Sequence, residues 1–290
     1  MDRRIATVGT FDGVHLGHLA VTDALQRFAA ERSLLPTVVT FDRHPLETVA
    51  PERTPKRLMS PADEVSALRS LGLDVIVERF TPDLMRLTAR QWMEGVRDNI
   101  GVRALVMGYD NTFGCDGLDM SLADYRRLGY QLGMDVIEAP VVPGISSSAI
   151  RRVLTGGDVE RGASMLGRPY RLEGTVEAGN QLGRTIGFPT ANLAVDSGRL
   201  VPANGVYACR AEMEDGSCNP AVVNIGVRPT VGEGLACTVE AHLPGWTGDL
   251  YGQTLKLDFA ARLRDEMRFG SLEELRGQIE RDCRAAISKI

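Results

Sequence analysis

Lysine is scarce in this chain of 290 residues, which contains only Lys56, Lys256 and Lys289. None of them completes the pattern G-x-x-x-x-G-K-[ST], so a P-loop is excluded. The dinucleotide fingerprint G-x-G-x-x-G is also missing, because the one G-x-G, at 232–234, has no third glycine at the required spacing. If the protein handles nucleotides, it must bind them by other means.

Cysteines are few and odd in number, and no two of them form a C-x-x-C pair: Cys115, Cys209, Cys218, Cys237 and Cys283. This pattern indicates reduced thiols rather than a disulfide framework or a zinc knuckle. No stretch approaches the roughly 18 apolar residues of a membrane span, and the first apolar run stops at Gly9 without resembling an export signal. We therefore expect a cytoplasmic protein with no membrane partner.

Charge of one sign does not dominate either half of the chain, whose net charge is −5. Neither half is therefore a basic surface, and we expect no nucleic-acid partner. The length exceeds the prior of about 100–200 residues per domain, which indicates two domains or one large barrel. The sequence makes no prediction of oligomeric state.

The first part of the chain alternates short β-branched runs with amphipathic stretches. We predict strands at 4–8, 36–41, 74–78, 103–107 and 135–138, and helices at 16–30, 61–71, 88–99 and 122–132. This alternation is typical of an α/β domain with a doubly wound parallel sheet. Ligands of such sheets bind beyond the carboxyl ends of the strands.

The second part has a different pattern. Two short helices, at 147–154 and 158–166, lead to a link at Gly167, so we expect domains at 1–167 and 168–290. Strands predicted at 170–178, 206–213, 221–225, 237–243 and 254–260 follow one another without helices, which indicates a small antiparallel sandwich or barrel. A capping-box start predicts a terminal helix at 271–288.

The segment 9–18 joins the first strand to the first helix and is a candidate anion site. Asp12 and Gly13 turn the chain, Gly17 permits close approach, and the helix start offers free N–H groups. His15 and His18 share one face of the first turn, where imidazole N–H groups can stabilise charge that grows on a phosphate. The alternatives are a polar helix start with incidental histidines, or a zinc site formed with His44.

A second glycine-rich run lies in the strand-rich part. Gly183 and Gly187 bracket a segment that can fold over phosphates with its backbone N–H groups. Thr190 and Asn192 fall on one face of an extended segment, and their oxygens suit Mg²⁺. Glycines in ordinary turns of an all-β domain are the alternative.

The sequence G-T-F-D-G-V-H-L-G-H at 9–18 resembles the H-x-G-H signature of nucleotidyltransferases, in the form found in bacterial bifunctional riboflavin kinase/FAD synthetases. Segments 41–45, 108–114 and 145–151 agree in order and spacing. The resemblance implies that FMN attacks the α-phosphate of ATP, giving FAD and pyrophosphate. The residues it implies for this step are the catalytic His15, His18 and Asp110, and the nucleotide-binding Gly9, Phe11, Gly17, His44, Ser147, Ser148 and Arg151.

Two positions depart from the pattern of that family. Arg43 stands where the family usually has proline, and Asn111 stands where an aromatic residue or histidine is common. Both departures bear on the binding of FMN.

The run at 183–192 is similar to the riboflavin kinase signature of the same family, and further segments agree at 205–208, 224–230, 239–242, 249–252 and 263–266. The resemblance implies a six-stranded barrel that transfers the γ-phosphate of ATP to riboflavin. Thr190 and Asn192 would hold Mg²⁺ with ATP, and Glu240 would be the general base. Gly183, Arg184 and Gly187 would complete the nucleotide site, and Arg264 would close over the flavin or the phosphates.

The position of Glu240 allows a test of that role, because its neighbours Val239 and Ala241 are apolar. Strand alternation puts Glu240 on the opposite face from them. If they pack the core, Glu240 faces solvent or a cleft.

The hypothesis is therefore a bifunctional enzyme that uses ATP and Mg²⁺ to convert riboflavin to FMN and FMN to FAD. One alternative is a riboflavin kinase with an inactive N-terminal nucleotide-binding domain. Others are a non-catalytic flavin-binding regulator, or a cytidylyltransferase, which shares the H-x-G-H feature but leaves the second domain unexplained.

Overall fold

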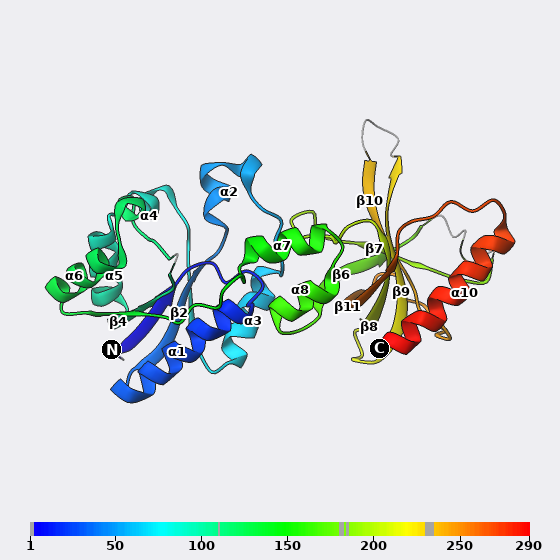
Figure 1. Cartoon of the computed structure of the whole chain (residues 1–290). Coiled ribbons are helices and arrows are strands. Elements are labelled where there is room, and N and C mark those ends of the chain that lie inside the picture. Colours follow the sequence, from blue (N-terminus) through cyan, green and yellow to red (C-terminus); the bar gives the residue numbers. More distant parts are fainter. Residues whose placement is uncertain (1–2, 110, 180–182, 184–185, 230–234) are drawn as a thin grey trace. The chain divides into compact units, whose positions relative to one another are not determined.

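The chain divides into two compact units in a computed structural model that describes residues 3–109, 111–179, 183, 186–229 and 235–290 (Figure 1). The first unit comprises Met1–Lys56 and Ser60–Ser146, and the second comprises Arg57–Met59 and Ser147–Ile290. Helices α7 (Ser147–Thr155) and α8 (Val159–Leu166), which precede the expected domain boundary at residue 167, cluster with the second unit.

The first unit is built on a parallel five-stranded sheet in the order β3-β2-β1-β4-β5. The strands are β1 (Arg4–Val8), β2 (Leu35–Phe41), β3 (Asp74–Glu78), β4 (Val102–Met107) and β5 (Asp135–Glu138). The prediction of a doubly wound parallel sheet is confirmed. The strand order reverses between β1 and β4, so ligands are expected at the carboxyl ends of these two strands.

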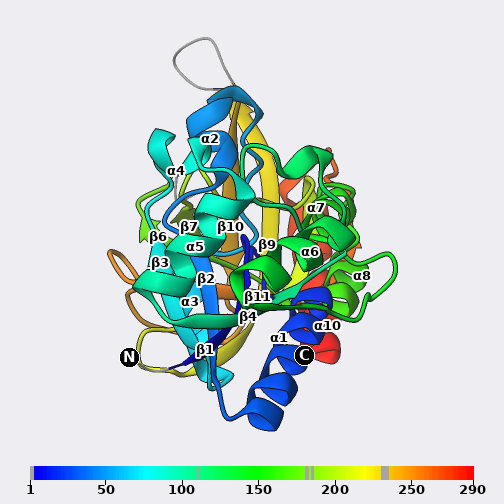
Figure 2. The ribbon, with the colours of Figure 1, turned by 90° about the vertical axis from the view of Figure 1, so that its left-hand side faces the viewer.

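The helices are divided between the two faces of this sheet (Figure 2). Helices α1 (Leu16–Arg32) and α3 (Pro61–Ser70) connect β1, β2 and β3, whereas α5 (Ala89–Asn99) and α6 (Leu122–Leu132) contact each other on the other side. Trp92, Met93 and Val96 of α5 pack with Ala6 and Val8 of β1. This core fixes the end of β1, where the first predicted site begins.

Several short helices were not predicted from the sequence. They are α2 (Pro45–Val49), η1 (Pro51–Arg53), α4 (Pro82–Arg86) and η2 (Gly117–Asp119). Each has three to five residues, too few for a helical hydrophobic period to emerge. None of the helices in the described part of the chain combines the length and apolar character that a membrane crossing needs.

The second unit is a closed antiparallel barrel with the strand order β10-β7-β6-β11-β8-β9. Its strands are β6 (Tyr170–Glu177), β7 (Ala191–Ala194), β8 (Gly205–Glu212), β9 (Cys218–Pro229), β10 (Leu235–His242) and β11 (Thr254–Arg264). The six-stranded barrel is confirmed. Strand β7 was not predicted, because it has only four residues, and β9 is longer than predicted, because Asn219 and Pro220 near its start are typical of a turn.

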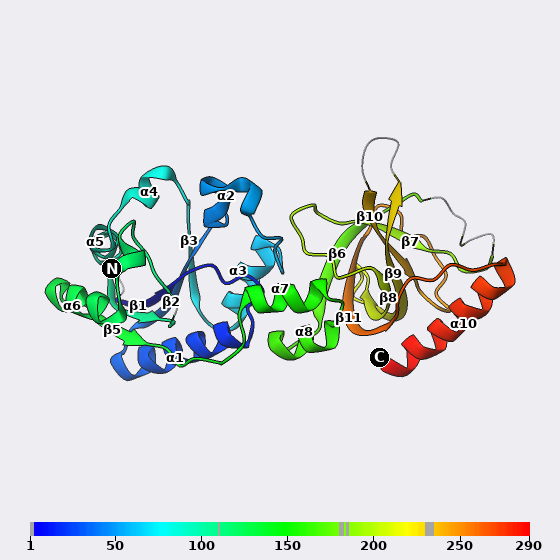
Figure 3. The same cartoon turned by 45° about the horizontal axis from the view of Figure 1, so that its top comes forward.

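The predicted C-terminal helix is confirmed as α10 (Leu272–Lys289), which runs along the outside of the barrel (Figure 3). Ser271 caps it by accepting a hydrogen bond from the Glu274 N–H. Ala286 is fully buried and packs with Val206 and Val222 of the barrel. The helix therefore covers β8, β9 and β11, and this covered face carries the second predicted site.

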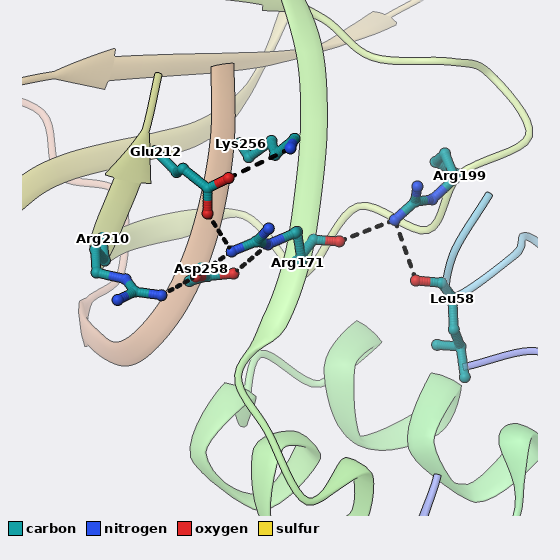
Figure 4. A network of polar contacts seen from close by, with 7 residues as sticks. All are labelled: Leu58, Arg171, Arg199, Arg210, Glu212, Lys256 and Asp258. Carbon is teal, nitrogen blue, oxygen red and sulfur yellow. Dashed lines mark hydrogen bonds and ion pairs between the residues drawn. The ribbon is translucent and has the colours of Figure 1, made fainter. Parts of the chain in front are cut away.

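A network of ion pairs joins three strands on another part of the barrel (Figure 4). Asp258 of β11 accepts two hydrogen bonds of 2.7 Å from Arg171 of β6 and one of 3.0 Å from Arg210 of β8. Glu212 extends the network to Lys256. Burial alone would raise the pKa of Asp258, but hydrogen bonds from the two arginines hold it below its ordinary value.

Hydrogen bonds from a buried arginine explain why residues Arg57–Met59 belong to the second unit. Arg199 donates hydrogen bonds to the backbone carbonyls of Leu58 at 3.1 Å and Arg171 at 2.8 Å (Figure 4). Its guanidinium neighbours the carboxylate of Glu173 at 3.7 Å. These hydrogen bonds provide donors to backbone carbonyls that are buried from water.

Candidate active sites

The first candidate site is the loop between β1 and α1. Gly9 follows β1, and its N–H donates to the Val39 carbonyl at 3.1 Å. Gly13 has a φ of +89°, a left-handed conformation that glycine adopts without strain. His15 is the N-cap of α1, because its Nδ1 accepts a hydrogen bond from the His18 N–H at 3.2 Å. The predicted turn and helix start are confirmed.

The two histidines of this loop lie against each other. Their rings stack with centroids 3.6 Å apart and planes 16° apart. The Phe11 ring lies 5.0 Å from the His18 ring and forms a second wall. A Cβ at position 17 would lie 3.1 Å from His15 Nδ1, so Gly17 allows the helix to begin this close to the imidazole. The structure thus gathers Phe11, His15, Gly17 and His18 as predicted.

His18 lies in surroundings that disfavour the charged form of its imidazole. Burial, together with the neighbouring His15, holds the pKa of His18 well below its ordinary value. The imidazole is therefore neutral at neutral pH, and its Nδ1 has no hydrogen-bond partner within the described residues. A neutral imidazole keeps one N–H, which can donate to a phosphate oxygen.

Glu64 of α3 holds this loop and was not found from the sequence. Its carboxylate is almost fully buried and accepts hydrogen bonds from the Phe11 N–H at 3.3 Å and from Thr40 Oγ1 at 2.9 Å. Glu64 thus ties the loop after β1 to the end of β2. An acidic residue in the first turn of a helix is usually explained by the helix dipole, so no sequence signal distinguished it.

His44 follows β2 and caps the short helix α2. Its Nδ1 accepts a hydrogen bond from the Leu46 N–H at 3.1 Å, and Glu47 completes a capping box. Among the described residues, no three His, Cys, Asp or Glu side chains gather so that they could hold a metal ion. His15, His18 and His44 therefore do not form the alternative three-histidine zinc set.

The two residues that depart from the family pattern, Arg43 and Asn111, each form a polar contact with another residue. Arg43 is exposed and pairs with Asp42 at 3.1 Å. Asn111 follows β4, and its side-chain amide donates to the Val8 carbonyl, which joins the carboxyl ends of β4 and β1. Asp110, predicted to hold the reacting groups, lies outside the described residues.

Ser147, Ser148 and Arg151 lie in the first two turns of α7. Ser148 is exposed, whereas Ser147 and Arg151 are half-buried. Because α7 clusters with the second unit, their contact with ATP phosphates stays a prediction.

The register of the barrel aligns one residue from each of five neighbouring strands. Glu240 of β10 is paired with Asn192 of β7 on one side and with Asn224 of β9 on the other. The row continues to Val206 of β8 and Arg264 of β11. Directly paired residues of adjacent strands project to the same face of a sheet. Three predicted residues, Asn192, Glu240 and Arg264, therefore share one face.

The burial of the flanking residues shows which face this is. Val239 is 3% exposed and Ala241 is fully buried, so both pack inside the barrel. Glu240 alternates with them and lies on the outer face. Of the two positions that the sequence left open, solvent or a cleft, the structure shows a cleft, because Glu240 lines a cavity of about 310 Å³.

The lining of this first cavity is partly polar and partly apolar. Its polar lining includes Thr190, Asn192, Asn224, Glu240, His242 and Glu266. Its apolar lining is contributed by the segment before β7, by β8 and β9, by the segment after β11, and by α10: Ile186, Phe188, Val206, Val222, Met267, Phe269, Leu275 and Ile279. Such a lining suits a ligand with a large aromatic part and one reacting hydroxyl.

The oxygen donors predicted to bind Mg²⁺ belong to the polar part of the lining. Thr190 offers a hydroxyl and Asn192 a carboxamide oxygen, a donor set that fits Mg²⁺ together with phosphates and water. Gly179 leaves room for Asn192, because a Cβ there would lie 2.1 Å from the Asn192 amide nitrogen. The structure therefore brings together side chains that fit the metal.

The glycines of the predicted phosphate segment differ in their surroundings. A Cβ at Gly183 would lie 2.3 Å from the Phe188 carbonyl oxygen, so the chain folds closely at this position. Gly187 has a φ of +88° and faces open space. It does not line the first cavity, whereas Gly183 does. Arg184 lies outside the described residues.

Arg264 lines the first cavity, but its guanidinium is already paired. It donates to both carboxylate oxygens of Asp282 of α10, with distances of 2.8–3.2 Å. Asp282 is buried and also accepts from Gln278 at 2.8 Å. Arg264 therefore anchors α10 to the barrel as one wall of the cavity. The sequence could not show this pairing, because 18 residues separate the two partners.

A second cavity of about 430 Å³ lies next to Thr190. Aromatic and polar residues of the segment after β10 line it, including Trp246, Asp249 and Tyr251. Thr190 lines both cavities. A group bound in one cavity can therefore approach a group bound in the other at Thr190. Segment 249–252, which agrees with the riboflavin kinase pattern, had no role predicted from the sequence.

Two family models together match nearly the whole chain. Residues 1–153 match the model described as FAD synthetase, and residues 166–290 match the model described as riboflavin kinase. The first match covers the loop with His15 and His18, and the second covers the barrel with both cavities.

Curated relatives match almost the whole chain. Proteins named bifunctional riboflavin kinase/FMN adenylyltransferase are 35% identical in Bacillus subtilis, over 98% of this chain and 92% of theirs, and 37% identical in Pseudomonas fluorescens, over 97% and 91%. The relative with this name in Escherichia coli K12 is 35% identical over 96% of this chain and 90% of its own. A solved structure from Streptococcus pneumoniae, described as a macrolide-efflux protein, shares the fold with a TM-score of 0.89 at 28% identity, over 99% of this chain and 94% of that one.

Proposed function

Because the chain belongs to the bifunctional riboflavin kinase/FMN adenylyltransferase family, and so makes FMN from riboflavin and FAD from FMN with ATP, we propose how its residues divide the two steps. Residues 168–290 phosphorylate riboflavin, and residues 1–167 adenylylate FMN. The observation that carries this division is the row of Asn192, Glu240 and Asn224, which lines a cavity together with many apolar side chains.

Riboflavin occupies the first cavity and ATP the second. The apolar lining of the first cavity suits the isoalloxazine ring, and the ribityl 5′-hydroxyl lies near Glu240 among the polar lining. The aromatic lining of the second cavity, with Trp246 and Tyr251, suits adenine. Thr190 lies where the two cavities adjoin, which supports transfer of the γ-phosphate at this point.

Glu240 acts as the general base of the kinase step. It receives the proton of the 5′-hydroxyl as the oxygen bonds to the γ-phosphorus and the bond to the β-phosphate oxygen breaks, leaving ADP. Thr190 and Asn192 hold Mg²⁺, which neutralises charge on the phosphates when bound. Gly183, Arg184 and Gly187 fold over the phosphates. Arg264 holds the wall of the flavin cavity through Asp282.

His15 and His18 act at the phosphates of ATP in the adenylylation step. The FMN phosphate oxygen bonds to the α-phosphorus, and the bond to the β-phosphate breaks to release pyrophosphate. The neutral imidazole of His18 donates a hydrogen bond to the phosphate oxygens, where charge accumulates. Gly9, Phe11, Gly17 and His44 shape the nucleotide site, Asp110 holds the reacting groups, and Ser147, Ser148 and Arg151 bind the β- and γ-phosphates.

Replacing Glu240 by glutamine tests the division. The Glu240→Gln protein should lose FMN formation by about 10²–10⁴-fold, because the hydroxyl proton has no acceptor. The same protein, supplied with FMN and ATP, should form FAD at the wild-type rate. Glu177→Gln is the matched control, because Glu177 is also paired with Asn192 but is exposed and does not line the first cavity. Equal loss of both steps in Glu240→Gln would refute the division.

A further inference from the structure

His242 is a buried residue of the first cavity to which the kinase mechanism above gives no role. It is the last residue of β10 and is 9% exposed. Two positions separate it from Glu240, so alternation places both side chains on the same face of the strand. Both line the first cavity.

The ring of His242 makes a hydrogen bond to the segment that leads into the metal ligands. Its Nδ1 lies 2.8 Å from the Pro189 carbonyl oxygen. A carbonyl oxygen only accepts, so Nδ1 carries the proton. The ring of Phe188 meets the imidazole edge-on, with centroids 5.3 Å apart and planes 76° apart. His242 therefore contacts both residues that directly precede Thr190.

Thr190 needs such support because it lies just outside the regular ladder. β7 begins at Ala191, which is paired with Ala241. Pro189 has no N–H with which to extend the pairing. The hydrogen bond from His242 acts on the remaining polar group of Pro189, its carbonyl. It joins the segment that carries Thr190 to the strand that carries Glu240.

We propose that His242 is a positioning residue of the kinase site, whose Nδ1–H holds the Pro189 carbonyl and thereby fixes Thr190 relative to Glu240. The inference rests on the proposed roles of Thr190 and Glu240. A hydroxyl that drifts by a fraction of an ångström loses its place in the octahedral ligand set that Mg²⁺ demands. Through Thr190, His242 thus acts on the binding of the nucleotide with Mg²⁺.

Two substitutions separate the hydrogen bond from the packing. His242→Asn keeps an N–H donor close to the place of Nδ1, whereas His242→Leu fills similar space without a donor. Binding of ADP to the full-length protein is measured by calorimetry, once with Mg²⁺ and once with EDTA. His242→Leu should weaken ADP binding about tenfold with Mg²⁺ and leave it unchanged with EDTA. His242→Asn should restore most of the loss.

Three results would overturn the proposal. His242→Leu could bind Mg²⁺ with ADP as tightly as the wild type, both variants could lose affinity equally, or the loss could persist in EDTA. If His242→Leu does not fold, His242→Phe replaces it, because a phenyl ring keeps the contact with Phe188 and lacks the donor.

The proposed function is tested separately. If the wild type phosphorylates riboflavin and Glu240→Gln does not, the kinase site stands, and the calorimetry decides the role of His242 alone. If Glu240→Gln phosphorylates riboflavin normally, the proposed function fails, whatever the His242 variants do.

Discussion

The two units present different side chains at their candidate sites, and we attribute the difference to the protonation states of the two proposed nucleophiles. The first unit presents stacked imidazoles, His15 and His18, at a helix start. The second presents a carboxylate, Glu240, between two asparagines on a barrel wall. The phosphate of FMN is already an anion at neutral pH and needs no base, whereas the hydroxyl of riboflavin must lose a proton. Under the proposed division, adenylylation therefore depends on positioning and charge stabilisation, and phosphorylation depends in addition on a base.

The units also differ in how far apart in the sequence their site residues lie. Phe11, His15, Gly17 and His18 lie within one loop and the first turn of α1. The row of paired residues in the barrel comes from five strands, which span the sequence from β7 to β11: Asn192, Glu240, Asn224, Val206 and Arg264. A single substitution in the loop should thus affect one step cleanly, whereas the barrel site also depends on the ladders that hold its strands.

The largest effect expected in the first unit is that of His18→Gln. This change should lower the formation of FAD from FMN by about 10²-fold or more, because one hydrogen-bond donor to the phosphates is lost or misplaced. FMN should then accumulate when riboflavin and ATP are supplied. The measurement is the chromatographic separation of the three flavins over time.

Phosphorylation of riboflavin by the same His18→Gln preparation is the internal control and should stay at the wild-type rate. If FAD formation also stayed unchanged, His18 would be an incidental residue of a polar helix start. If both steps fell together, the two units would not work independently.

A smaller effect is expected from Gly179→Ala in the second unit. The new Cβ would lie 2.1 Å from the Asn192 amide nitrogen, so the asparagine must move while the barrel stays intact. Phosphorylation should fall roughly tenfold and require more Mg²⁺, because a metal ligand is displaced. Gly277→Ala is the control, since its Cβ on α10 meets its nearest neighbour at an ordinary 3.6 Å. An unchanged Mg²⁺ requirement in Gly179→Ala would argue against Asn192 as a ligand.

The smallest effect is on stability and has a pH dependence. Asp258→Asn should lower the free energy of unfolding of the barrel by up to about 3 kcal/mol at pH 7, because a buried carboxylate between two arginines is lost. The pKa of Asp258 lies below its ordinary value in the folded chain, so its ion pairs stabilise the barrel above about pH 4. This contribution is lost as the pH falls through the folded pKa, and the difference between variant and wild type should vanish in stronger acid.

Urea unfolding measures this difference in a Trp92→Phe background, where Trp246 is the one remaining tryptophan and reports on the barrel. Glu280→Gln serves as the control, because its pair with Arg276 is exposed and should contribute less than about 1 kcal/mol. A difference that persisted at pH 2 would show that Asp258 acts by packing instead of by charge.

The sequence predicted the elements of the first unit well because its chemistry is local. Alternating strands and helices identified the sheet, and the glycines with His15 and His18 identified the loop at its edge. Glu64 was missed because it comes from a helix that begins more than 40 residues later and resembles an ordinary acidic first turn.

In the barrel, the sequence predicted most of the strands but not the surroundings of the site residues. Strand alternation left two surroundings open for the Glu240 side chain, solvent or a cleft. The choice between them depends on which element covers the strand. That cover is α10, which the sequence predicted as a helix without indicating its docking face. Asn224 and His242 were missed for the same reason, because their neighbours follow from ladder register and from one hydrogen bond between distant segments.

The direct test of the account is a time course of the purified protein with riboflavin, ATP and Mg²⁺, in which riboflavin, FMN and FAD are separated chromatographically. The account predicts that FMN rises first and that FAD follows at its expense. A reaction that stops at FMN, even when more ATP is added, would contradict an active first unit. Arg43 and Asn111 would then be the first positions to revert to the family pattern.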